Sequence, residues 1–109
     1  MKKFDIGSIE TSPYEHREKN VFYQTREFKM RIIGLAPGES LPECDMASHV
    51  VFICIEGEVE VSVGEKKISL STGQGLVIEP STVSMKTDTG ARLLGIQIAK
   101  ARAGTAEEG

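Results

Sequence analysis

The sequence has few of the residues and segments that mark export, disulfide stapling or membrane insertion. Only two of its 109 residues are cysteine and two are histidine, so a disulfide framework is excluded. The longest uninterrupted apolar run, Val50 to Ile55, is far too short to span a bilayer. The first residues carry lysine but no apolar stretch of the kind a secretory signal needs. We therefore expect a cytoplasmic protein with no membrane partner.

The charge balance excludes a second class of partner. The formal net charge is -3, and no basic stripe with interleaved aromatic residues occurs, so we expect no binding to nucleic acid. With 39% hydrophobic and 27% charged residues, the composition is that of an ordinary globular protein. The length predicts one domain over residues 1–109, with a core from about 21 to 98, an N-terminal segment over 1–20 and a frayed tail over 100–109.

Residues 27 to 33 alternate between polar and apolar side chains, which is typical of a half-buried strand. We predict that the apolar members face the core and that the polar members face solvent without a function. The first set is Phe28, Met30 and Ile32, and the second is Glu27, Lys29 and Arg31.

The rest of the chain has the same period. Val59, Val61 and Val63 alternate with polar residues, and Gly64-Glu65 predicts a hairpin turn after them. No stretch shows a sustained helical period with caps. Short strands separated by Gly and Pro turns indicate an all-β, antiparallel barrel or sandwich.

Two segments carry the most specific pattern. The first, residues 37–57, reads PGESLPECDMASHVVFICIEG, and the second, residues 73–85, reads GQGLVIEPSTVSM. Their spacing resembles the two motifs of the cupin family, whose first motif runs G-x5-H-x-H-x3-E-x6-G. Gly38 and Gly57 stand at its two ends with the right separation. The resemblance covers residues 37–98 and implies a jelly-roll β-barrel of the cupin (RmlC-like) type.

The resemblance also implies a metal held by three His and one Glu, but this chain has other residues in those places. Cys44, Met46 and Val50 occupy the three ligand positions of the first motif, and Met85 occupies the His position of the second. Alternate residues of a strand share a face, so we expect these side chains to point into the barrel. Phe52 and Cys54, which follow with the same parity, should line the same cavity.

Three interpretations of this site are open. The side chains are core, because Met, Cys, Val and Phe are commonly buried. Alternatively, Cys44, Met46 and Met85 bind Cu(I), since a thiolate and two thioethers suit a soft ion. A strand shifted by one residue would instead offer Glu43, Asp45 and His49, but it would expose the apolar set.

The resemblance implies either a small-molecule binding protein or a metal-dependent enzyme such as an isomerase or dioxygenase. Because the usual ligands are absent, we expect a protein that binds a small molecule in the barrel or is catalytically silent, and no catalytic residue is assigned. Cys44 lies between Glu43 and Asp45, whose charges disfavour a reactive thiolate. Whether the chain is an enzyme stays open. We also expect a homodimer, because pairing covers open sheet edges.

Overall fold

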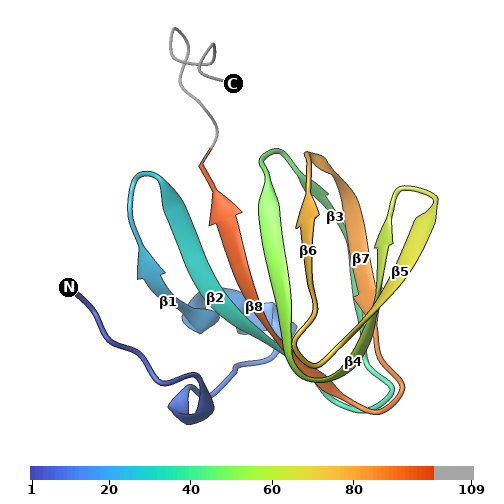
Figure 1. Cartoon of the computed structure of the whole chain (residues 1–109), viewed down its shortest axis with the longest axis horizontal. Coiled ribbons are helices and arrows are strands. Elements are labelled where there is room, and N and C mark those ends of the chain that lie inside the picture. Colours follow the sequence, from blue (N-terminus) through green and yellow to red (C-terminus); the bar gives the residue numbers. More distant parts are fainter. Residues whose placement is uncertain (100–109) are drawn as a thin grey trace, which may run out of the picture.

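Eight antiparallel strands curl into an open barrel in the computed structural model, which describes residues 1–99 (Figure 1). The strands are β1 (Val21–Gln24), β2 (Phe28–Leu35), β3 (Ser40–Met46), β4 (Val50–Val63), β5 (Lys66–Ser71), β6 (Gly75–Ile78), β7 (Ser81–Lys86) and β8 (Ala91–Ile98). Two short 3-10 helices, η1 (Ile6–Ser8) and η2 (Tyr14–Asn20), precede them. The prediction of an all-β, antiparallel jelly roll is confirmed. The predicted frayed tail, residues 100–109, lies outside the described residues.

The long strand β4 holds the two walls of the barrel together. The main path of the sheet runs β1-β2-β8-β4-β7-β3, and β5 and β6 also pair with β4. The first part of β4 pairs with β6 and β8, and its second part pairs with β5 and β7. Between the two parts, at Cys54 to Glu56, the register with β8 shifts. Such an irregularity bends a strand and increases its twist, which lets one strand serve both walls.

The register shift also changes which residues of β4 face inward. Val50 and Phe52 are buried before it, and Val59 and Val61 are buried after it, so the inward parity moves from even to odd numbers. The predicted alternation of Val59 and Val61 with exposed Glu58 is confirmed. The predicted hairpin is confirmed as well, because Val63 pairs with Lys66 across a two-residue turn in which Gly64 has φ 60°.

The assignment of the two faces of β2 from the sequence is wrong. Arg31 pairs with Gly95 of β8, and Gly95 pairs with buried Phe52 of β4, so Arg31 shares the inner face of the barrel. Ile32 is fully buried, yet it is not a member of the barrel core. It pairs instead with Leu94 on the outer face. Phe28, Met30 and Ile32 therefore share the outer face of β2, whereas Arg31 shares the inner face with Ile33 and Leu35.

The N-terminal segment provides the cover for that outer face. A Cβ atom added at Gly34, which shares a face with Ile32, would lie 2.6 Å from Thr11 Oγ1. Arg92 of β8 donates from Nη2 to the carbonyl oxygens of Ile6, at 3.3 Å, and Ile9, at 2.6 Å. The chain then passes to the inner side, where η2 lines the cavity; in Figure 1, η1 lies below β1 and β2, and η2 lies behind the strands. In residues 1–99, no helix is long and apolar enough to cross a membrane.

Candidate functional site

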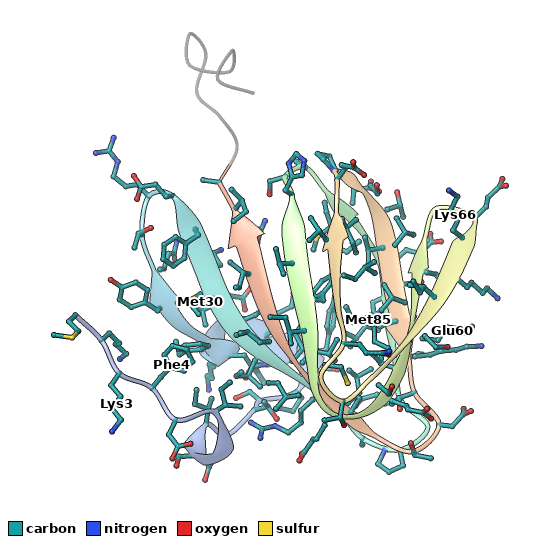
Figure 2. The ribbon with its side chains drawn as sticks, in the orientation of Figure 1. Lys3, Phe4, Met30, Glu60, Lys66 and Met85 are labelled. Carbon is teal, nitrogen blue, oxygen red and sulfur yellow. The ribbon has the colours of Figure 1, made fainter. Side chains whose placement is uncertain are left out.

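A cavity of about 230 Å³ opens inside the barrel between its two walls and η2. The floor is apolar, and Met85, which is 5% exposed, lies within the curve of the sheet (Figure 2). Polar side chains come mainly from η2, β2 and β8. The lining residues are Tyr14, Arg17, Asn20, Arg31, Ile33, Gly34, Leu41, Pro42, Cys44, Asp45, Met46, Val50, Phe52, Val83, Ser84, Met85, Gly95 and Gln97.

The pairing of β3 with β7 explains why the residues singled out from the sequence meet in this cavity. Cys44 pairs with buried Val83, and Leu41 pairs with Met85. Paired residues of antiparallel strands project to the same face, so Cys44 faces inward although it is exposed at the rim. Five of the six predicted positions line the cavity: Cys44, Met46, Val50, Phe52 and Met85.

The sixth position, Cys54, is not part of the cavity lining. It is fully buried, and its thiol donates to the carbonyl oxygens of Glu56, at 3.6 Å, and Gly57, at 3.4 Å. Burial raises the pKa of the Cys54 thiol above its ordinary value. Cys54 therefore packs as core at the bend of β4.

The strand register separates the backbone positions of the three sulfur-containing side chains that were predicted as copper ligands. Met46 pairs with Ser81, which lies four residues before Met85 on β7. At about 3.3 Å per residue, four steps along a strand separate the two positions by roughly 13 Å. Two sulfur ligands of one ion lie within roughly 5 Å of each other. Met side chains are long and flexible, so this backbone separation does not test Cu(I) binding by Cys44, Met46 and Met85, which stays a prediction.

The other candidate metal ligands are the harder side chains of His, Asp and Glu. Among residues 1–99, no group of three or more His, Cys, Asp and Glu side chains is arranged to hold a metal. Asp45 at the rim accepts a hydrogen bond of 2.6 Å from the hydroxyl of Thr82, and Glu43 and His49 are exposed. The set of Glu43, Asp45 and His49 therefore forms no metal site in this structure.

Two arginines form the charged part of the cavity. Arg31 projects from β2 on the inner face, and Arg17 comes from η2. Burial, followed by the positive charge of Arg17, lowers the pKa of the Arg31 guanidinium from its ordinary value, and the weaker effects of Glu18 and Cys44 oppose them.

The side chain of Arg17 is held in place by Tyr14. Its guanidinium carbon lies 4.2 Å from the centre of the Tyr14 ring, and Nη1 donates a 3.0 Å hydrogen bond to the Tyr14 carbonyl. Sequence reasoning placed Arg31 on a solvent face and did not consider Arg17. In the sequence, the one signal for a contact between these two residues is the spacing Tyr14-x2-Arg17. Residues three apart eclipse each other in a 3-10 helix, so this spacing fits one helical turn.

Comparison with known proteins identifies the fold. No family model and no curated protein matches the sequence. Among solved structures, the TT1209 protein of Thermus thermophilus is similar over 93% of this chain and 100% of its own, with a TM-score of 0.80 and 22% identity. The EutQ protein of Clostridium difficile aligns over 89% and 86% of the two chains, with a TM-score of 0.72 and 10% identity.

A third structure carries a family name in its description. A cupin superfamily protein of Desulfitobacterium hafniense aligns over 73% of this chain and 74% of its own, with a TM-score of 0.69 and 17% identity. The strand order, the inward-facing motif positions and these similarities agree, and the chain has the cupin fold.

Proposed function

We propose that this protein binds a small organic molecule in the cavity inside its barrel. The observation that carries the proposal is the cavity itself, in which an apolar floor meets a small number of polar side chains. This combination is typical of small-molecule sites. At about 230 Å³ the space is smaller than the roughly 300–1,000 Å³ of pockets for drug-sized ligands, which favours a small metabolite.

The apolar floor would supply most of the affinity. Val50, Phe52, Val83 and Met85 are each at most 5% exposed and belong to the core of the barrel. Burying apolar ligand surface against them contributes about 25 cal/mol per Å² before the costs of association. Because their backbones lie in paired strands, the floor is rigid, and little ordering is needed on binding.

The chemistry of the cavity favours binding over covalent catalysis. Within residues 1–99, the thiol of Cys44 has one hydrogen bond, at 4.0 Å to the carbonyl oxygen of Asp45. A nucleophilic thiol needs a neighbouring base or another group that stabilises its thiolate, and a peptide carbonyl does neither. Cys44 thus serves the proposed site as part of the rim.

The test is a screen of small polar metabolites and fragments by ligand-observed NMR, followed by titration of the hits. Val83→Phe would fill the cavity from β7, and we expect it to abolish binding. Val77→Phe is the matched control, because Val77 is 68% exposed on β6 and lies outside the cavity. Circular dichroism checks that both variants fold. Equal binding by the two variants would refute the proposal.

A further inference from the structure

The cavity holds two positively charged groups without a matching pair of acids. Arg17 and Arg31 both line it, and Asp45 is the one acidic residue of the lining. The Asp45 carboxylate is already engaged by the hydroxyl of Thr82 at 2.6 Å. Within residues 1–99, the single ion pair joins Lys86 to Glu60 at 3.3 Å, and it involves neither arginine. The cavity therefore carries one net positive charge.

Arg31 differs from Arg92 in having no hydrogen bond, in the described part of the chain, that would account for its position. Arg92, on the neighbouring strand, donates two hydrogen bonds to backbone carbonyls of the N-terminal segment. Among the described residues, the Arg31 guanidinium takes part in no hydrogen bond, although it is half-buried. The Arg31 nitrogen atoms are not among the fully buried atoms that lack a partner, so they are open to the cavity and free to bind a ligand. A second arginine, Arg17, lines the same cavity, and an anion at this place would relieve the repulsion between the two positive charges.

The cavity also has a charged end, at Arg31, and an apolar end, at Phe52. Across β8, only Gly95 stands between Arg31 and Phe52. A Cβ atom at Gly95 would lie 3.4 Å from both the Phe52 ring and Ile33 Cδ1. The Phe52 ring and Ile33 therefore pack over Gly95, and the cavity that these residues line together with Arg31 offers a ligand an apolar surface next to a charged group.

We propose that the natural ligand is a small monocarboxylate with an apolar body, its carboxylate held by Arg31 and Arg17. This inference rests on the proposed binding function and names its ligand class. A guanidinium presents a planar fork of N–H donors that matches the two oxygens of a carboxylate. One negative charge balances the net charge of the lining, whereas a dianionic phosphate would exceed it. The apolar body would contact Phe52, Val50 and Met85.

The experiment compares acids with their uncharged amides on the whole chain. Butanoate and benzoate are titrated beside butanamide and benzamide at constant ionic strength, with the amide signals of Gly95 and Ile33 followed by NMR. We expect the acids to bind at least tenfold more tightly than the amides. Arg31→Gln and Arg17→Gln should each weaken acid binding by about tenfold or more and leave amide binding unchanged. Arg26→Gln, at an exposed arginine outside the cavity, is the control and should change neither.

The outcomes separate this inference from the proposed function. Acids and amides that bind equally well, with no effect of Arg31→Gln, would overturn the carboxylate assignment and leave small-molecule binding intact. If inorganic phosphate displaces benzoate at similar concentrations, the site is a general anion site and the assignment is wrong. If none of the four probes binds, the assignment is also wrong, and the fragment screen alone then decides the proposed function. Should Arg31→Gln not fold, the acid-to-amide ratio of the wild type and Arg17→Gln still decide.

Discussion

Arg31 and Phe52 share the inner face of the barrel, and only Gly95 separates them across strand β8. The register places a charged residue and an aromatic residue of the core on the same face, and the residue between them adds no side chain. Arg31 is half-buried there, and burial and Arg17 together lower its pKa. A half-buried charge near a second positive charge is costly to the free protein, and under the proposed function it serves to bind the ligand's carboxylate.

Replacing Arg31 should therefore stabilise the protein while impairing binding. For Arg31→Met, whose side chain keeps the length but not the charge, we expect the free energy of unfolding to rise by about 1 kcal/mol. Urea denaturation of wild type and variant measures the change. Arg26→Met, at an exposed position, should leave stability within about 0.5 kcal/mol of the wild type. A clear loss of stability in Arg31→Met would mean that Arg31 has a structural role.

Gly57 should tolerate no side chain. Its φ is +85°, and a Cβ atom there would lie 2.1 Å from the carbonyl oxygen of Gly90 and 2.9 Å from Ala91 Cα. We expect Gly57→Ala to cost several kcal/mol or to prevent folding. Gly73 has nearly the same φ, +89°, with nothing within 4 Å of such an atom, so Gly73→Ala should cost only about 1–2 kcal/mol. Equal midpoints of the two variants in urea would contradict the steric explanation.

The hydrogen bonds of Arg92 should control the order of the N-terminal segment. Arg92→Gln removes the donors to the carbonyls of Ile6 and Ile9, at an expected cost of about 1 kcal/mol. Hydrogen exchange followed by mass spectrometry should show faster exchange in residues 1–20, with β4 unchanged. Because η2 supplies Tyr14 and Arg17 to the cavity, ligand affinity should fall as well. Unchanged exchange in this segment would show that other contacts hold it.

Copper binding separates the two interpretations of the sulfur-containing side chains. Because the strand register separates the backbone positions of Met46 and Met85, we expect them not to share an ion and Cys44→Ser to leave Cu(I) affinity unchanged. Anaerobic competition against a Cu(I) chelator, with wild type and variant in parallel, measures this. Stoichiometric binding that Cys44→Ser lowers by orders of magnitude would instead support a soft-metal site.

The expectation of a homodimer can be tied to one surface. Val77 is 68% exposed and Ile53 is 36% exposed, and the register of β4 with β6 places both on the outer face of the sheet. Light scattering should give twice the chain mass of 11.9 kDa, and Val77→Glu should shift the mass toward that of one chain. Ile68→Glu on β5, where Ile68 is 45% exposed, is the control. A wild-type mass of 11.9 kDa at micromolar concentration would contradict the dimer.

The local pattern of the sequence determined the class of fold and the inward residues of the cupin-like motif. Turn residues and a period of two define strands, and the spacing from Gly38 to Gly57 placed Cys44, Met46, Val50 and Phe52 on one face. Both predictions depend on neighbours within a strand, since Cys44 and Met46 lie together in β3 and Val50 and Phe52 lie together in β4. Cys54 shows the limit of this reasoning: parity gives a face, but the depth along β4 at which the cavity ends depends on where that strand bends.

The charged half of the site was decided by tertiary structure. Alternation in β2 separates Arg31 from Ile32 but does not say which face is the lumen, because a strand can bury either one. Here the N-terminal segment covers the face of Ile32, with Thr11 against Gly34 and Arg92 bound to Ile6 and Ile9. That cover makes the face of Ile32 an outer one and leaves Arg31 on the inner face with Phe52. The placement of Arg31 and Phe52 on one face depends on contacts between distant parts of the chain, and no local pattern carries that information.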